Sequence, residues 1–85
     1  MANPWFVYLL RCGDDSLYAG ITTDVERRIS EHNEGGPKSA KYTRNRRPVK
    51  LVYQEECKDR SNATKREMAI KKLTRKKKLE LIAGS

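Results

Sequence analysis

Two short apolar runs near the start of the chain are separated by turn-forming residues. Residues 5–11 read WFVYLLR, residues 17–21 read LYAGI, and the break between them is CGDDS. Aromatic, β-branched and aliphatic residues in runs of this length are typical of strands, whereas Gly and Asp are typical of turns. The sequence therefore predicts an antiparallel hairpin. This hairpin constrains the fold strongly, because only 36% of the 85 residues are hydrophobic and the core must be thin.

The hairpin brings two tyrosines together. A loop of three to five residues centred on Gly13 or Asp14 pairs positions whose numbers sum to 26 or 28. Tyr8 then faces Tyr18 directly, or diagonally through Leu10. Because both sums are even, we expect the two phenol groups on the same face of the sheet.

A helix is expected directly after the hairpin. The segment TTDVERRISEHNEGG at 22–36 contains Thr23 and Glu26, which fit a capping box. Val25 and Ile29 form a narrow apolar stripe, and Gly35 is a suitable helix end. Arg28 and His32 lie one turn apart at the border of that stripe, so both side chains could lean over the tyrosine face.

The second half of the chain alternates between irregular, strand and helical patterns. Residues 36–48 are basic and irregular, with room for one helical turn, and VKLVYQEE predicts a third strand from Val49 to about Gln54. From Ser61 the pattern is helical, and Thr74 is placed to cap a last short helix, RKKKLELIA. Residues 1–85 are expected to form one domain.

One carboxylate stands where a core helix usually has an apolar residue. Ala63, Ile70 and Leu73 define the apolar stripe of the helix from Ser61, and Glu67 lies on the same stripe. A buried unpaired carboxylate is costly, so Glu67 needs a cation, a shifted pKa or a route to water. The ordinary explanations are that the Glu67 side chain extends to water or forms a salt bridge with Lys71 or Arg11.

Charge and cysteine content restrict the function classes. The net charge is +8, and residues 57–85 carry ten basic residues against three acidic ones. Such a distribution suits nucleic acid, although a solvated lysine-rich helix face would look the same. A membrane surface is less favoured, because no basic stretch is paired with a broad apolar face. No basic region precedes the six-residue apolar run Trp5–Leu10, so neither a signal peptide nor a membrane span is expected and the cytoplasm is the favoured location.

A zinc site and a dense disulfide framework are also disfavoured. Cys12 and Cys57 lack CxxC spacing, and His32 is the sole histidine, so a zinc site is not expected. Free thiols are favoured over one disulfide between the two cysteines.

Five residues suggest phosphodiester chemistry when they are taken together: Tyr8, Tyr18, Arg28, His32 and Glu67. Hydrolysis needs a water to be deprotonated, cationic groups for the phosphoryl charge, and stabilisation of the leaving oxygen. An arginine fork matches phosphate, and one acidic residue with spare water positions suits magnesium. Taken singly, each residue also has a structural explanation, such as half-buried strand tyrosines, a packed histidine or a surface Arg28–Glu31 pair.

The motifs resemble those of a known family. VYL at 7–9, YAG at 18–20 and the following DVERRISEH resemble the signature of the GIY-YIG nuclease superfamily, in particular its small single-domain bacterial branch. The similarity continues through HNEG, KYTRNRRPVKLVY, KREMAIKKL and LTRKKKLELI. The resemblance implies an α+β fold with a small three-stranded antiparallel sheet flanked by helices, in the order ββα(α)βαα. It also implies endonuclease activity on nucleic acid, with DNA favoured over RNA as the substrate. One divalent metal, Mg²⁺ or Mn²⁺, is implied as the cofactor, and DNA repair or recombination as the process.

The resemblance also implies roles for the five residues. Tyr8 occupies the place of the general base, Tyr18 that of its partner near the attacking water, and Arg28 that of the phosphate-binding arginine. His32 matches a histidine beside the site, and Glu67 matches the metal ligand. VYL and YAG replace GIY and YIG, and no asparagine follows Glu67, where many relatives have one.

A basic surface is expected to bind the nucleic acid, and Tyr42 could stack on a base unless it is an ordinary surface or core tyrosine. The residues expected there are Arg27, Lys41, Tyr42, Arg44, Arg46, Arg47, Lys71, Lys72 and Arg75. The alternative to an endonuclease is a nucleic-acid-binding module of the same fold that cleaves weakly or not at all. A domain that binds an acidic protein is a third hypothesis with little support.

Overall fold

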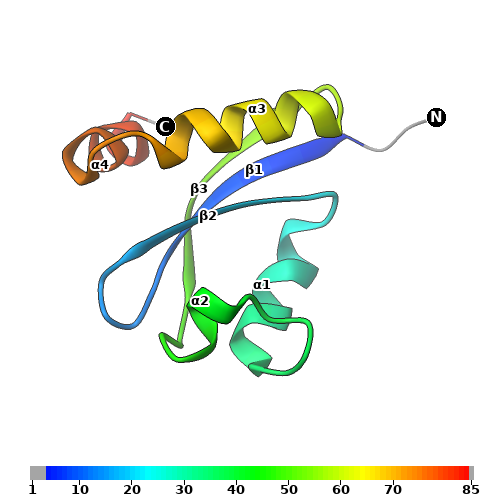
Figure 1. The fold of residues 1–85 in the computed structure, drawn as a ribbon, viewed down its shortest axis with the longest axis vertical. Helices are drawn as coiled ribbons and strands as arrows, with labels where there is room; N and C mark the ends of the chain where they lie inside the picture. The colour runs from blue at the N-terminus through cyan, green and yellow to red at the C-terminus, as the bar shows by residue number, and fades with distance from the viewer. Residues whose placement is uncertain (1–3, 85) are drawn as a thin grey trace.

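A three-stranded antiparallel sheet with helices on both faces forms the protein in the computed structural model, which describes residues 4–84 (Figure 1). The strand order is β2-β1-β3, so β2 and β3 are the edge strands. The elements are β1 (Trp5–Arg11), β2 (Leu17–Thr22), α1 (Val25–Glu34), α2 (Lys41–Arg44), β3 (Lys50–Cys57), α3 (Arg60–Lys71) and α4 (Arg75–Ala83). The α+β fold and its element order are therefore as predicted.

The hairpin adopts the second of the two predicted registers. Tyr8 pairs with Gly20 and Leu10 pairs with Tyr18, so the tyrosines are diagonal neighbours. A backbone hydrogen bond of 2.8 Å from Cys12 N to Ser16 O closes the turn, and Asp15 adopts a positive φ of 69°. Both phenol groups lie on the same face of the sheet, because residues two apart along a strand project to the same side.

The two faces of the sheet carry separate core clusters. Val7, Leu9 and Ala19 pack with Ile70 of α3 on one face, with side chains of α4 beside them. The other face carries a second cluster of Tyr8, Leu10, Cys12 and Val49, against which Tyr18 and Ile29 pack. Figure 1 shows this layering, with α3 on one side of the sheet and α1 and α2 on the other. The tyrosines therefore lie on the α1 side.

The N-cap of helix α1 lies one residue later than predicted. Asp24, rather than Thr23, is the N-cap, and its carboxylate accepts a hydrogen bond of 3.1 Å from Arg27 N. The predicted capping box was wrong because the neighbouring aspartate takes the extended cap conformation. The predicted end is confirmed, since Gly35 has a left-handed φ of 70°. His32 is the fully buried residue of this helix, whereas the stripe residues expected to be inside are half-buried.

The second half of the chain follows the predicted order with different limits. Strand β3 extends to Cys57 rather than Gln54, because it pairs with β1 along its whole length, with an irregularity between Leu9 and Leu10. Asp59 caps α3, and Thr74 caps α4 as predicted, accepting a hydrogen bond of 3.2 Å from Lys77 N.

Two other expectations concern membranes and thiols. Among residues 4–84, no helix has both the length and the apolar character needed to cross a membrane. Cys12 and Cys57 are free cysteines, and burial raises the pKa of the Cys12 thiol.

Candidate functional site

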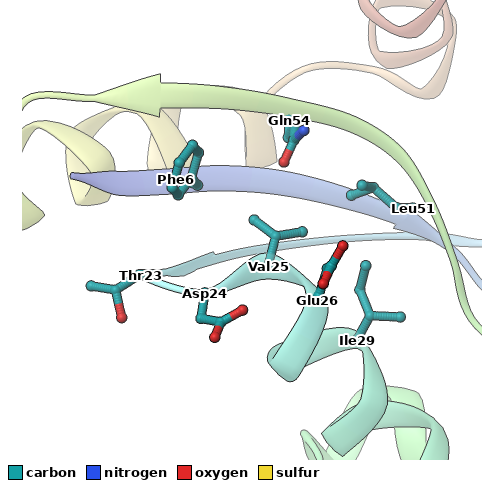
Figure 2. Close-up of a pocket in the computed structure, with 8 residues that line it drawn as sticks. All are labelled: Phe6, Thr23, Asp24, Val25, Glu26, Ile29, Leu51 and Gln54. Atoms are coloured by element: carbon teal, nitrogen blue, oxygen red, sulfur yellow. The ribbon is translucent and has the colours of Figure 1, made fainter. Parts of the chain in front are cut away.

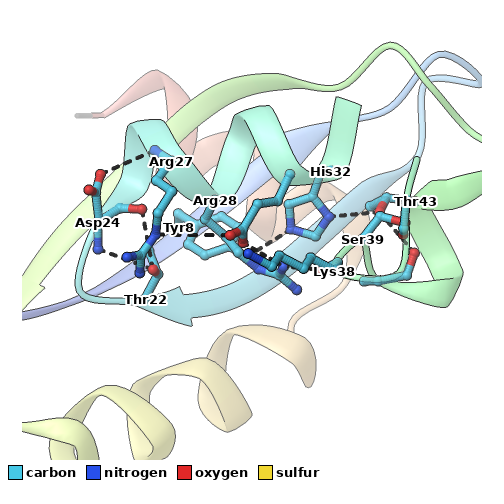
Figure 3. A network of polar contacts seen from close by, with 12 residues as sticks. Tyr8, Thr22, Asp24, Arg27, Arg28, His32, Lys38, Ser39 and Thr43 are labelled. Carbon is cyan, nitrogen blue, oxygen red and sulfur yellow. Dashed lines mark hydrogen bonds and ion pairs between the residues drawn. The ribbon is translucent and has the colours of Figure 1, made fainter. Parts of the chain in front are cut away.

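A buried polar chain links side chains from three elements on the α1 side of the sheet (Figure 3). Tyr8 Oη of β1 lies 3.1 Å from Nε2 of His32 in α1, and His32 Nδ1 lies 2.7 Å from Oγ1 of Thr43 in α2. The Thr43 hydroxyl donates in turn to the carbonyl of Ala40, at 3.1 Å. Tyr8, His32 and Thr43 are 1%, 0% and 0% exposed, so water does not compete for these bonds.

Aromatic rings surround the imidazole. The Tyr8 and Tyr18 rings meet His32 edge-on, with ring centroids 6.2 and 5.4 Å from that of the imidazole. Tyr42 stacks on Tyr18 at 5.6 Å with an angle of 25° between the planes, and the Arg46 guanidinium carbon lies 4.1 Å from the Tyr42 ring centroid. Tyr42 therefore extends the cluster to the surface, and part of its ring is already covered by protein groups.

Tyr8, Tyr18 and His32 are uncharged at neutral pH, because burial opposes their ionisation. Burial, and then the charge of Arg28, lowers the pKa of His32 from 6.5 to about 4. Burial, and then the neighbouring Tyr18, raises the pKa of Tyr8 from 10.0 to about 12, against the lowering effect of Arg28. Burial also raises the pKa of Tyr18. The resting state is a phenol beside an uncharged imidazole.

Arg28 lies next to the tyrosines but has protein partners of its own. Its Nη1 donates to Glu31 Oε1 at 3.1 Å and to the carbonyl of Lys38. Its side chain is 25% exposed. A guanidinium has five N–H donors, so Arg28 could also bind a phosphate at its exposed edge.

Glu67 stands in a helix on the opposite side of the sheet from α1 (Figure 1). It belongs to α3, which packs on β1 and on the edge strand β2. Its side chain is 18% exposed, with Lys71 Nζ 3.8 Å from Oε1. The negative charge of Glu67 raises the pKa of both Tyr8 and Tyr18, so it acts on the site electrostatically.

The sequence predicts a single carboxylate, that of Glu67, as the protein ligand of a metal ion. No group of three or more His, Cys, Asp or Glu side chains that could hold a metal occurs within residues 4–84. Magnesium keeps several waters and takes substrate oxygens as ligands, so a single partly buried carboxylate such as Glu67 fits it, whereas zinc would need more protein ligands.

Several of the cations predicted to bind nucleic acid already serve the fold. Arg46 Nε lies 3.0 Å from Asp14 Oδ2, and Arg75 Nη2 lies 3.1 Å from Asp15 Oδ2, so the hairpin loop holds both. Arg47 donates to the carbonyls of Asn33, Glu34 and Arg44. The side chains of the remaining predicted cations are exposed. Arg27 is 4.0 Å from Glu31, and Lys41, Arg44, Lys71 and Lys72 are exposed.

No sequence pattern indicated that Thr43 and Asn33 make buried or structural hydrogen bonds. Thr43 stands in the basic irregular segment, where no periodicity indicates burial. The Asn33 side chain accepts from Val49 N at 2.8 Å and donates to Val49 O at 3.2 Å, which ties the end of α1 to the start of the third strand. A polar residue before a helix-ending glycine carries no signal for such a contact.

A pocket of about 400 Å³ lies between the sheet and the start of α1 (Figure 2). Phe6, Leu51 and Gln54 of the sheet and the first turn of α1 line it, and Asp24 and Glu26 stand on the helix side. None of the predicted catalytic or nucleic-acid-binding residues lines this pocket, so the candidate site does not coincide with it.

Comparison with known proteins agrees with these motifs. The family described as the GIY-YIG catalytic domain matches residues 4–80. The UPF0213 protein of Desulfotalea psychrophila is 57% identical over 81 residues, covering 95% of this chain and 73% of that protein. The UPF0213 protein of Listeria welshimeri is 54% identical over 77 residues, covering 91% of this chain and 83% of the relative.

Solved structures show the same fold. The NMR structure of EF2693 from E. faecalis matches with a TM-score of 0.64 and 43% identity, covering 98% of this chain and 86% of that one. The UPF0213 protein BH0048 from Bacillus halodurans matches with a TM-score of 0.59 and 44% identity, covering 94% and 83%. This chain therefore belongs to the GIY-YIG family of nuclease domains.

Proposed function

We propose that this protein is an endonuclease that hydrolyses phosphodiester bonds in DNA with the help of one divalent cation, Mg²⁺ or Mn²⁺. The observation that carries the proposal is the hydrogen bond between Tyr8 Oη and His32 Nε2. It gives a phenol a neutral proton acceptor in a buried cluster, beside the guanidinium of Arg28. A net charge of +8 favours binding of a polyanion.

The geometry suggests how the water could be activated. A phenol with a pKa of about 12 keeps its proton at neutral pH, so Tyr8 does not act as a resting phenolate. Because Tyr8 is 1% exposed in the resting structure, substrate binding would have to bring the attacking water to Tyr8 Oη. In our proposal, Tyr8 Oη then takes a proton from that water while its own proton passes to His32 Nε2. The hydroxide forms the new P–O bond as the bond to the leaving oxygen breaks. The negative phosphate nearby would raise the pKa of His32 from about 4 and favour this transfer.

Arg28 and Glu67 complete the proposed machinery. The guanidinium would bind the phosphoryl oxygens, exchanging its hydrogen bond to the Lys38 carbonyl for one to phosphate. Glu67 would hold the cation, which would supply Lewis-acid stabilisation of negative charge on the phosphate and the leaving oxygen. Tyr18 would help to orient the water.

A second function is favoured by the resting state of the site. Arg28 is bonded to Glu31 and to a backbone carbonyl. Tyr8 is protonated at neutral pH, and a neutral phenol is a poor base. Since no asparagine follows Glu67 in the sequence, the chain could instead bind nucleic acid and cleave it weakly or not at all.

Cleavage assays with matched variants separate the two functions. Purified protein is incubated with plasmid, single-stranded and branched DNA, and with RNA of matching sequence, with Mg²⁺, Mn²⁺ or EDTA. Glu67→Gln and Arg28→Ala are compared with Glu80→Gln, which removes one charge from the exposed side of α4. We expect metal-dependent DNA cleavage that both site variants abolish and Glu80→Gln retains.

The other outcomes are equally informative. Cleavage that persists in both site variants would contradict the assigned site. Binding without cleavage in the parent protein would favour the second function. Preferential cleavage of RNA would correct the substrate.

A further inference from the structure

We propose that Thr43 is a positioning residue of the candidate site. Its hydroxyl holds His32 in the tautomer that carries hydrogen on Nδ1, and so presents an unprotonated Nε2 to Tyr8. The tautomer assignment stands on the contacts alone, whereas its effect on cleavage rests on the proposed function.

The Ala40 carbonyl, at one end of the series of hydrogen bonds, sets their direction. The carbonyl of Ala40 can only accept, and Thr43 Oγ1 lies 3.1 Å from it. A hydroxyl has one hydrogen, so once Thr43 donates to Ala40 its oxygen can only accept. His32 Nδ1, at 2.7 Å, must then supply the hydrogen of the second bond. Since a neutral imidazole carries one N–H, Nε2 is left with a lone pair.

The electrostatics of Arg28 are compatible with the same direction. A guanidinium has donors and no acceptor, and its effect is to lower the pKa of Tyr8. The phenolic hydrogen of Tyr8 can point to His32 Nε2, 3.1 Å away. The hydrogen bonds then run in one direction from the Tyr8 hydroxyl to the Ala40 carbonyl.

Reversing the direction of these hydrogen bonds would weaken the contacts of both Tyr8 and Thr43. If Nε2 carried the hydrogen, it would donate to the Tyr8 oxygen, and the phenolic hydrogen of Tyr8 would lose Nε2 as its acceptor. Nδ1 would have to accept from Thr43, which would give up its bond to Ala40. Water cannot compensate, because Tyr8, His32 and Thr43 are at most 1% exposed. Removal of the Thr43 hydroxyl alone would leave Nδ1–H without its acceptor, and the balance between the tautomers would shift.

The placement of Thr43 gives the segment at 36–48 a role in the site. Thr43 is the buried residue of the four-residue helix α2, whose other members are exposed. This helix packs on α1. Through Thr43, the segment therefore acts on Tyr8 by way of the imidazole.

Three variants test the proposal. Thr43→Val replaces the hydroxyl by a methyl group at nearly constant shape, and Thr43→Ser keeps the hydroxyl. Thr64→Val is the matched control, because the Thr64 hydroxyl also bonds a backbone carbonyl, that of Arg60 at 2.9 Å, but in α3. The chain has one histidine, so every imidazole signal of the untagged protein belongs to His32.

The principal readout is the tautomer of His32, measured by long-range ¹H–¹⁵N NMR on the full chain without metal or substrate. We expect hydrogen on Nδ1 in the parent protein, in Thr43→Ser and in Thr64→Val, and a substantial fraction on Nε2 in Thr43→Val. Hydrogen on Nε2 in the parent protein would overturn the proposal. So would an unchanged tautomer in a folded Thr43→Val. If Thr43→Val does not fold, the position of the imidazole hydrogen in the parent protein and in Thr43→Ser still tests the tautomer assignment.

Cleavage is the second readout. Thr43→Val should lower the cleavage rate at least about tenfold, because general base catalysis of this kind contributes roughly 10²–10⁴. Thr43→Ser should restore most of the rate, and Thr64→Val should keep it. If the parent protein cleaves no substrate, the proposed function fails while the tautomer assignment stands. If the parent cleaves and the tautomer is the opposite one, the positioning role fails alone.

Discussion

The ring of Tyr8 lies directly over Gly20, its partner on the neighbouring strand. A Cβ added at Gly20 would stand 2.6 Å from Tyr8 Cζ and 3.1 Å from Cε1, which no ordinary contact allows. The two residues face each other in the register of β1 and β2. Because Gly20 has no side chain, the phenol can cross the edge strand and reach His32.

Gly20→Ala should therefore displace the Tyr8 ring and break its hydrogen bond to His32. We expect loss of cleavage and a decrease of about 1–3 kcal/mol in the free energy of unfolding, as for other overpacked sites. Cleavage assays and urea unfolding check both. Gly36→Ala is the control, since a Cβ there would meet no atom within 4 Å. Equal effects of the two substitutions would contradict the packing argument.

Acid should destabilise the protein through His32. In the folded protein its pKa is lowered from 6.5 to about 4, mainly by burial, so the unfolded chain binds a proton that the folded protein does not. The contribution of His32 to stability is complete above pH 6.5 and is lost progressively as the pH falls toward about 4. The loss should be on the order of 3 kcal/mol.

Urea unfolding of the parent protein and of His32→Asn across this pH range measures the effect. Because the chain has no other histidine, the difference between the two pH slopes belongs to this side chain. The variant should show the weaker pH dependence. Parallel slopes would mean that His32 is protonated in the folded protein at a normal pKa.

Asn33→Ala should weaken the junction between α1 and β3. The amide of Asn33 bonds both the N–H and the carbonyl of Val49, so its loss leaves two partly buried backbone groups without their partner. We expect about 1–3 kcal/mol of destabilisation, and a smaller loss for Asn33→Asp, which keeps the acceptor. Urea midpoints should be compared with those of Asn62→Ala, at an exposed position of α3. Identical midpoints for Asn33→Ala and Asn62→Ala would rule out the clamp.

Arg47→Lys should lower stability while leaving the electrostatic part of DNA binding unchanged. The guanidinium bonds three carbonyls, including those of Asn33 and Glu34 at the end of α1, and lysine cannot reproduce this fork. A loss of about 1 kcal/mol is expected. The salt dependence of DNA affinity should stay the same, because the charge is kept. The opposite pattern, weaker binding at full stability, would identify Arg47 as a direct nucleic-acid contact.

Lys72 and Arg75 should differ in their effect on DNA binding. Lys72 is exposed at the end of α3, whereas the Arg75 guanidinium is held by Asp15 at 3.1 Å. Lys72→Gln should reduce the slope of log affinity against log salt by about one, and Arg75→Gln should reduce it less. Affinities measured at several salt concentrations test this. A salt-independent affinity of the parent protein would contradict phosphate-dominated binding.

Local patterns predicted those features that depend on neighbouring residues. The alternation of the hairpin placed Tyr8 and Tyr18 on one face, Gly35 indicated the end of α1, and Thr74 indicated the start of α4. Thr23 was predicted as the N-cap of α1 in place of Asp24, because both residue types are good N-caps. The extended conformation adopted by Asp24 decided between them. The roles predicted for the five site residues stay predictions, although the structure brings four of them into one cluster.

By itself, the sequence determined the strands, the helices and the face on which the tyrosines lie, because periodicity, caps and turns act within a few residues. Only the tertiary structure decided which partners the buried polar groups have. Thr43 meets His32 across 11 residues of chain, and His32 meets Tyr8 across 24. These contacts depend on how the irregular segment before β3 packs on α1, and no local repeat encodes that packing. The direction of the hydrogen bonds through His32 follows from that arrangement.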